Sequence, residues 1–221
     1  MSRFLGPIHY VVFNRIKAFE QLEKNIIQEM EAFSDKDISN FVSQLYEKYE
    51  EPLGDEPLEE LIDTDNIHGW LQNRIDIAET RHAALLSNFL SVYEEKAFCI
   101  VKGCYEKQGA EAGLDAKKTK NVSTPQGLYQ AIYDSILDGM PCDQVNEIIE
   151  NAEDHLRWEV KNCLHKKYWK EGDKNLDLFY QFRAAWITKF IENANPEFSY
   201  EFFQKEIDDT PTLIHRIYKN Q

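Results

Sequence analysis

The sequence predicts a mainly α-helical protein, in which long helices form a bundle and a small antiparallel β element lies near the C-terminus. As far as Ala152, apolar residues recur at spacings of three or four, which is typical of amphipathic helices. Beyond residue 155, short aromatic and β-branched runs replace this period. Apolar residues make up 43% of the chain, which is enough for a packed core. A fold made of helices throughout is the alternative.

Two helices are predicted in the first fifty residues. The first begins at Pro7, which suits a first helical turn, and the second runs from about Asp35 to Glu50. The Pro- and Gly-containing stretch 52–57 marks the loop that follows. The apolar stripe of the first helix consists of Ile8, Val12, Ile16, Phe19, Leu22, Ile26, Met30 and Phe33.

A third long helix is predicted after Asn66, whose side chain can cap it, and its apolar stripe continues toward Cys99. The stretch 108–124 is rich in Gly, Ala and Lys and lacks a clear stripe, so it is expected to be a mobile connection or a weak helix end. We therefore expect helical hairpins that form a bundle over residues 1–110. Residues 124–221 should hold helices and a possible small sheet, packed with the first part as one globular unit.

Three further helices are predicted in the second half. Thr124-Pro125 opens one that ends at Gly139, and a second starts at 141–143 and continues through 145–152. The third spans 176–191 and carries a broad aromatic face.

The C-terminal region is predicted to form the small sheet. The runs 198–203 and 213–218 are aromatic and β-branched, and Asp208-Asp209-Thr210-Pro211 between them is a hairpin signal. Residues 156–162 alternate as a half-buried strand would and also fit a helix, so they are a candidate third strand.

Charge and cysteine content restrict the partners and the compartment. The chain has 25 Lys+Arg against 39 Asp+Glu, a formal charge of -14, which repels nucleic acid and anionic membranes. No apolar run approaches the length of a membrane-spanning helix, and the N-terminal stretch 4–13 lacks a signal-peptide cleavage site. The four cysteines form no C-x-x-C pair, which indicates reduced thiols. We expect a cytoplasmic protein that binds neither nucleic acid nor membrane and is compatible with homo-oligomers.

A short internal repeat relates the starts of two long predicted helices. Residues 8–16 and 67–75 share the pattern Ile-His, four residues, then Asn-Arg-Ile, so five of nine positions match. A match of this quality arises by chance about once in such a chain, so the shared position at a helix start is the better argument for two related hairpins. The same offset aligns Glu20 with Glu79, and Glu23 with His82.

These aligned residues are candidate metal ligands. Glu79 and His82 lie one turn apart on one helix face, where a carboxylate and an imidazole can bind one ion. The Glu79-x-x-His82 spacing resembles the E-x-x-H element of ferritin-like di-iron bundles, with Glu20 in the place of the partner-helix glutamate. This resemblance implies iron, manganese or zinc bound by Glu20, Glu23, Glu79 and His82, with redox chemistry open to it. A second E-x-x-H is missing, because Glu23 stands where its histidine would be.

Weaker resemblances involve other segments. His155-x-x-x-Glu159 is similar to a ligand spacing of hemerythrin-type bundles. The segments 6–9, 66–71 and 139–143 resemble parts of uncharacterised bacterial helical proteins, which implies a prokaryotic stand-alone protein.

Two further sites are candidates for binding and catalysis. His9 and His68, each near a helix start, can bind an anionic ligand together if the two N-termini lie side by side; capping or packing roles are the alternative. Cys142 lies at a predicted helix N-terminus, where the dipole stabilises a thiolate, and with Cys163 and His165 it suggests a cysteine-dependent hydrolase. An unreactive structural cysteine is the alternative.

The leading functional hypothesis is a helical bundle that binds a metal ion or a small ligand. The four tryptophans and many other aromatic residues either line a pocket for a flat ligand such as haem or belong to the core. A non-catalytic interaction or sensor protein is the alternative.

Overall fold

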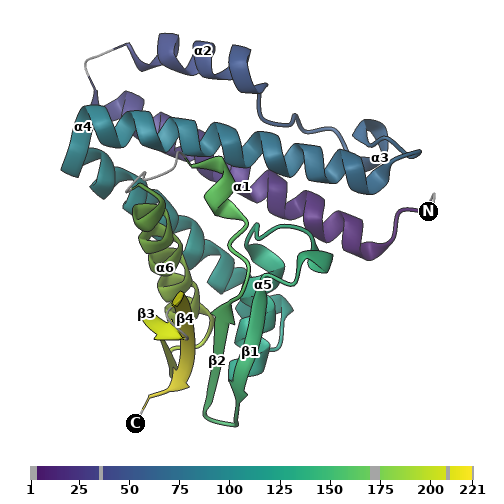
Figure 1. Cartoon of the computed structure of the whole chain (residues 1–221), viewed down its shortest axis with the longest axis vertical. Helices are drawn as coiled ribbons and strands as arrows, with labels where there is room; N and C mark the ends of the chain where they lie inside the picture. The colour runs from purple at the N-terminus through teal and green to yellow at the C-terminus, as the bar shows by residue number, and fades with distance from the viewer. Residues whose placement is uncertain (1–3, 35–36, 170–174, 208–209, 221) are drawn as a thin grey trace. The chain divides into compact units, whose positions relative to one another are not determined.

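The computed structural model describes residues 4–34, 37–169, 175–207 and 210–220. It confirms a mainly helical protein with a small antiparallel sheet near the C-terminus (Figure 1). The chain forms two compact units. Unit 1 consists of residues 1–101 and 165–176, and unit 2 consists of residues 102–164 and 177–221. The division falls inside a long helix, and the chain returns to unit 1 before it completes unit 2.

Unit 1 contains the predicted N-terminal helices. Helix α1 spans Pro7–Phe33, α2 spans Ile38–Tyr49, and the short α3 spans Leu58–Leu61. Helix α4 begins at Ile67, directly after Asn66, whose side chain accepts a hydrogen bond from Gly69 as a cap does. None of the described helices is long and apolar enough to cross a lipid bilayer.

Helices α1 and α4 run parallel and in register, with the residues that the repeat aligns facing one another (Figure 1). The rings of His9 and His68, which are 59 positions apart, meet near the start of both helices. Ser34 and Tyr93, again 59 positions apart, form a hydrogen bond of 2.9 Å near the other end. Buried positions repeat every seven residues on both helices, as in a parallel coiled coil. They include Val12, Ile16, Phe19, Ile26 and Met30 on α1 and Leu71, Ile75, Ala78, Leu85 and Phe89 on α4.

The stretch 108–124 is predicted to be a mobile connection or a weak helix end. The mobile connection is wrong over most of this length, because α4 continues to Thr119. A kink at Glu94, where φ is 49° and ψ is -124°, separates its two parts. In unit 2 the second part packs against α6, Asn175–Ala194, with Gly109 and Gly113 at the contact. A Cβ atom on either glycine would lie 2.2 or 2.3 Å from a backbone oxygen of α6. Glycine here therefore permits close helix packing and does not end the helix.

Unit 2 contains a four-stranded antiparallel sheet with strand order β1-β2-β4-β3. Strand β2 spans His155–Val160, β3 spans Phe198–Ile207 and β4 spans Thr210–Lys219, so the strands predicted in these regions are confirmed. The turn residues 208–209 lie outside the described residues. Thr124 caps α5, Pro125–Ser135, by accepting a hydrogen bond from Gly127, as its sequence predicts.

The prediction of a helix from 141 to 152 is wrong. Pro141–Asp143 form a short 3-10 helix, and Asn146–Asn151 form the edge strand β1. Gln144, at φ 48° and ψ 48°, takes a left-handed conformation that ends the helical turn. Residues 146–151 then pair with β2. Two adjacent isoleucines, Ile148 and Ile149, fit a strand and a helix equally, so the pairing with the next strand decides between them.

One face of the sheet contacts helices and carries aromatic residues. Trp158 of β2 lies opposite His215 of β4, which lies opposite Phe202 of β3. Directly opposed residues share a face, so these three rings form a row. Tyr129 of α5 packs edge-on against Trp158 at 5.0 Å between ring centroids, and Tyr180 of α6 stacks on Phe202 at 6.4 Å.

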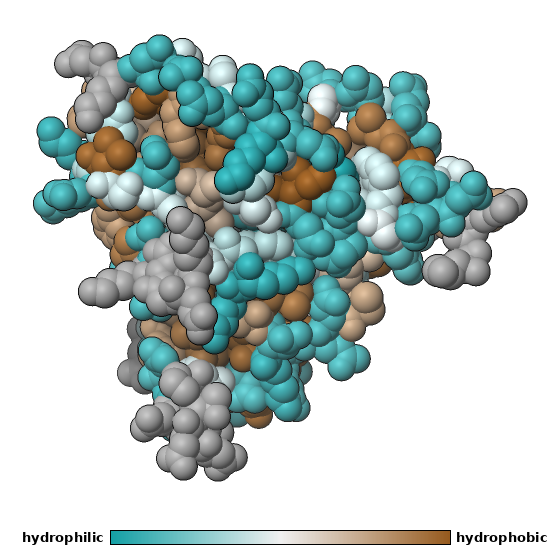
Figure 2. Space-filling view, turned by 45° about the horizontal axis from the view of Figure 1, so that its top comes forward, coloured by the Kyte–Doolittle hydropathy of each residue, from teal (hydrophilic) through white to brown (hydrophobic). Residues whose placement is uncertain are grey.

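The surface matches the acidic, charged composition. On the face shown in Figure 2, hydrophilic residues predominate and hydrophobic residues appear as scattered patches. Scattered apolar residues are normal on protein surfaces and do not by themselves mark a docking site.

Candidate functional site

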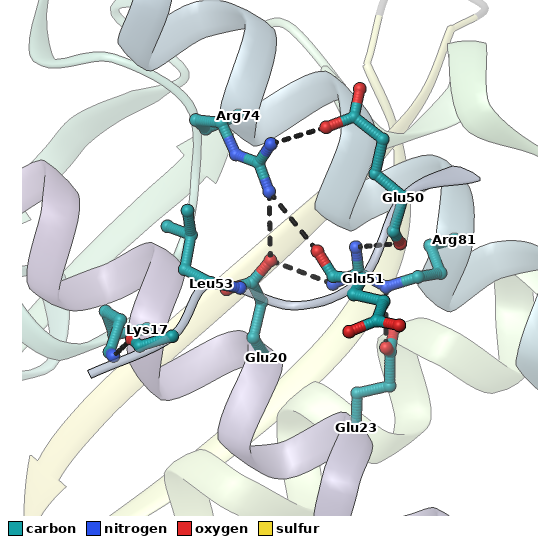
Figure 3. Close-up of polar contacts among 9 residues, drawn as sticks. Lys17, Glu20, Glu23, Glu50, Glu51, Leu53, Arg74 and Arg81 are labelled. Atoms are coloured by element: carbon teal, nitrogen blue, oxygen red, sulfur yellow. Dashed lines mark hydrogen bonds and ion pairs between the residues drawn. The ribbon is translucent and has the colours of Figure 1, made fainter. Parts of the chain in front are cut away.

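A buried cluster of charged residues lies between α1 and α4 in unit 1 (Figure 3). Arg81 is fully buried and donates from Nε to Glu23 at 2.7 Å and from Nη2 to Glu20 at 2.8 Å. Its Nη1 donates to the backbone oxygen of Glu50 at 3.0 Å. The other oxygen of Glu20 accepts from the backbone N–H of Leu53 at 2.9 Å. The cluster therefore ties the segment after α2 to both long helices.

A second arginine adds contacts to the segment after α2. Arg74 donates to the Glu50 carboxylate at 2.8 Å and to the backbone oxygen of Glu51 at 3.4 Å. Glu50 has φ 62° and ψ 157°, a backbone conformation that is almost confined to glycine. Such strain persists only where surrounding contacts impose it. The two arginines supply these contacts on the backbone and the side chain of Glu50.

Burial shifts the proton equilibria of two facing residues in this cluster. Burial raises the pKa of Glu23 to about 7, although the neighbouring Arg81 lowers it. Burial, with the positive charge of Arg81, lowers the pKa of His82 to about 3. Nδ1 of His82 lies 3.9 Å from Oε2 of Glu23. At pH 6 the folded chain therefore holds a proton on Glu23 and none on His82.

We expect Glu23→Gln to change how stability depends on pH. From pH 4.5 to about 7 the folded state keeps a proton on Glu23 that the unfolded state releases, so Glu23 contributes less stability as the pH rises. The variant lacks this loss and should gain about 1.4 kcal/mol per pH unit over the wild type in that window. Urea unfolding at several pH values measures the difference.

His82 changes the pH dependence of stability in the opposite direction, so its contribution can be told apart from that of Glu23. The unfolded state takes up a proton on His82 below pH 6.5 that the folded state accepts only near pH 3, so this residue destabilises the fold as the pH falls. A Glu23→Gln curve parallel to the wild-type curve between pH 4.5 and 7 would contradict the assignment to Glu23.

The arrangement does not support a metal centre at the predicted ligands. Glu20 and Glu23 bind a guanidinium, and Glu79 lies buried 3.0 Å from Nδ1 of His165. Within the described ranges, no group of three or more His, Cys, Asp or Glu side chains could hold a metal ion. The predicted binding of iron, manganese or zinc therefore has no geometric basis in the described residues.

His9 and His68 meet as the anion-site hypothesis requires. The backbone N–H of Gly6 donates to His9 Nδ1 at 2.9 Å, so the neutral ring of His9 carries its proton on Nε2. The Nε2 atoms of the two rings are 3.2 Å apart, and His9 is thus the donor to His68. This bond joins the N-termini of α1 and α4, and anion binding there stays a prediction.

The remaining predicted residues are dispersed. His155 bonds to Asp154 at 2.8 Å, and its partner in the proposed ligand spacing, Glu159, lies with it on strand β2, not on a helix. Cys142 is exposed in the short 3-10 helix, so the argument from a long-helix dipole is wrong. The Cys163 thiol lies 2.8 Å from the hydroxyl of Tyr180.

Unit 2 contains a cavity of about 40 Å³ between α5, α6 and the sheet. Its wall combines aromatic rings with one arginine and one aspartate. Arg183 approaches Asp138 at 3.3 Å, and Asn146 donates to the same carboxylate at 3.0 Å. A groove of about 470 Å³ shares Tyr129, Tyr133 and Asn146 with the cavity. The cavity therefore adjoins a groove with an exposed polar rim.

His215 is the unusual residue of this wall. It is buried, and its ring stacks on Trp158 at 4.9 Å and 7°. The hydroxyl of Tyr200 lies 2.7 Å from Nδ1, whereas Nε2 is buried with no hydrogen-bond partner among the described residues. Burial lowers the pKa of His215 to about 3 and raises the pKa of Tyr200, so both groups are neutral at pH 7.

The neutral state of both groups leaves two directions for this hydrogen bond, because Tyr200 can donate to Nδ1 or accept from it. We assign Tyr200 as the donor and Nδ1 as the acceptor, because a phenol is a better hydrogen-bond donor than acceptor. The single ring proton of His215 is then on Nε2. A buried N–H donor without an acceptor costs about 1–3 kcal/mol, which is unusual in a native core unless another molecule satisfies it.

The sequence analysis missed these residues, although one signal was available. Leu213, His215 and Ile217 alternate along a predicted strand, which puts a histidine on the apolar face. Asp138 and Arg183 gave no such signal, because only the tertiary fold brings them to the cavity.

Comparison with known proteins adds no identification. No family model, no curated protein and no solved structure matches the chain. The resemblances to ferritin-like, hemerythrin-type and bacterial helical proteins therefore stay predictions.

Proposed function

We propose that this protein binds a small organic molecule in the cavity of unit 2. The observation that carries this proposal is the buried Nε2–H of His215, a hydrogen-bond donor without an acceptor in the wall of an aromatic cavity. Ligand sites combine apolar and aromatic walls with a few such polar groups. The metal-binding bundle predicted from unit 1 has less support, because its carboxylates already bind Arg81.

The size of the cavity limits the ligand. About 40 Å³ is far less than a macrocycle such as haem requires, because sites for ligands of that size have volumes of roughly 300 Å³ or more. Tyr129 and Tyr133 are half-buried and line both the cavity and the groove. A bound molecule therefore places a small head in the cavity and extends between these rings into the groove.

The four tryptophans provide an internal test. In the wild-type chain labelled with ¹⁵N, each indole N–H gives a separate NMR signal, which replacement by phenylalanine assigns. A ligand in the cavity should shift the Trp158 signal, because only this tryptophan lines it. The Trp70 and Trp169 signals, from unit 1, are the control. If no member of a library of small aromatic and polar fragments shifts Trp158 selectively, the cavity is a packing defect and the proposal fails.

We expect the double variant Tyr200→Phe/His215→Phe to be at least as stable as the wild type. Phenylalanine keeps both rings, and replacing both hydrogen-bond partners together leaves neither unpaired. Removing the unsatisfied Nε2–H should add about 1 kcal/mol to the free energy of unfolding. The gain should grow as the pH falls from 6.5, where protonation of His215 favours the unfolded wild type. Urea unfolding at pH 7 and pH 5 measures both effects, and a large loss at pH 7 would contradict them.

A further inference from the structure

We infer that the head of the ligand is a neutral, planar amide, carried on an aromatic ring. This inference rests on the proposed function and specifies its ligand. Three properties of the cavity determine the class: its size, its charge balance and the hydrogen-bonding groups of its wall.

The size selects a small head. A volume of about 40 Å³ is far below the roughly 300 Å³ or more of a site for a drug-sized ligand, and it suits a group as small as a carboxamide. A carboxylate and an aminomethyl group have nearly the same size, so size alone does not distinguish the three.

The charge balance excludes the two charged heads. Arg183 is the cation of the wall, and it is neutralised by Asp138, which lies 3.3 Å away and is buried. His215 is neutral at pH 7. A carboxylate or an ammonium in the cavity would thus be buried without a counter-charge of its own, which is strongly unfavourable.

The hydrogen-bonding groups match an amide. Nε2–H of His215 is a donor that requires an acceptor, and the carbonyl oxygen of an amide supplies one. The Asp138 carboxylate accepts a hydrogen bond from Asn146, forms an ion pair with Arg183 and lines the same cavity, where a carboxylate is an acceptor for an amide N–H.

Aromatic rings continue from the cavity to the groove. Tyr129 lies edge-on to Trp158 at 5.0 Å and stacks with Tyr133 at 6.3 Å. A ring attached to the amide can pack against these side chains, as offset and edge-on aromatic pairs do. The polar atoms of Gln144 and Glu147 line the outer groove, so substituents of the ring that reach it can be polar.

Three probes of one size test this inference on the full chain. Benzamide is neutral, benzoate is an anion and benzylamine is a cation at pH 7. We expect benzamide to shift the Trp158 indole signal with a dissociation constant about tenfold or more below those of the other two, because it alone avoids an uncompensated buried charge. In Tyr200→Phe/His215→Phe, which keeps both rings, benzamide should bind about tenfold more weakly.

Every other result contradicts either the amide inference or small-molecule binding itself. Tighter binding of benzoate or benzylamine would overturn the amide inference and leave small-molecule binding intact. Unchanged benzamide binding in the double variant would show that His215 is not the donor, which also overturns the inference. If none of the three probes shifts Trp158, the amide inference fails; if the fragment library also leaves Trp158 unshifted, small-molecule binding fails with it.

Discussion

Replacing Arg81 by methionine should lower the stability of unit 1 by about 3–5 kcal/mol. The change leaves the buried carboxylates of Glu20 and Glu23 without their arginine, and the backbone oxygen of Glu50 loses a donor. Removing one partner of a buried ion pair costs far more than the pair contributes, because the remaining charge stays desolvated. Hydrogen exchange of the α1 amides measures this loss in unit 1 of the full chain.

Two variants separate charge burial from the loss of packing. Arg74→Met removes an arginine whose nearest carboxylate, that of Glu50, is 63% exposed and which lies 3.9 Å from buried Glu20, so its cost should be about 1 kcal/mol. Adding Glu20→Gln and Glu23→Gln to Arg81→Met removes the unpaired charges and should recover part of the loss. An Arg81→Met loss no greater than that of Arg74→Met would show that the cluster is not an obligatory part of the core.

Alanine at Gly109 and Gly113 together should destabilise unit 2 by about 2–6 kcal/mol, from about 1–3 kcal/mol for each overpacked site. The two new Cβ atoms would lie 2.2 and 2.3 Å from the backbone oxygens of Trp186 and Phe190, so α6 would have to move. A backbone atom cannot rotate away as the end of a side chain can. Hydrogen exchange of the α6 amides measures the effect.

The same helix supplies a matched control. A Cβ on Gly103 would meet nothing within 4 Å. Gly103→Ala should therefore stabilise α4 by up to about 1 kcal/mol, through helix propensity alone. If Gly109→Ala and Gly113→Ala also raised stability, the close approach of α4 to α6 would be disproved.

The helices with a strong apolar stripe and a cap were predictable from the sequence, as α1 and α5 illustrate. Both depend on local signals, namely Pro7 in a first turn and Thr124 as a cap. The end of α4 and the strand β1 were not predictable in this way. Gly109 reads locally as a helix breaker, and its place inside a helix depends on α6, which is distant in sequence. Ile148-Ile149 suits either period, and its conformation depends on pairing with the neighbouring strand β2.

The candidate sites, like the helices and strands, were predictable only where a local signal exists. The repeat indicated that Glu23 and His82 are equivalent, and the structure brings them face to face. The sequence did not indicate that Arg81 would take the carboxylates, because a charged residue beside an apolar stripe normally faces solvent. The cavity of unit 2 combines residues of α5, α6 and three strands, an arrangement that no local spacing encodes.

Part of unit 1 is synthesised only after the first part of unit 2. Glu79 is buried against His165, which belongs to unit 1 but is made 86 residues later (165 − 79), after the whole first part of unit 2. At about 5–20 residues per second, a ribosome needs roughly 4–17 s to produce that partner. Until then the nascent chain must either bury a lone carboxyl or keep this region open to chaperones and proteases. Unit 1 therefore cannot finish folding before the first part of unit 2 has been made.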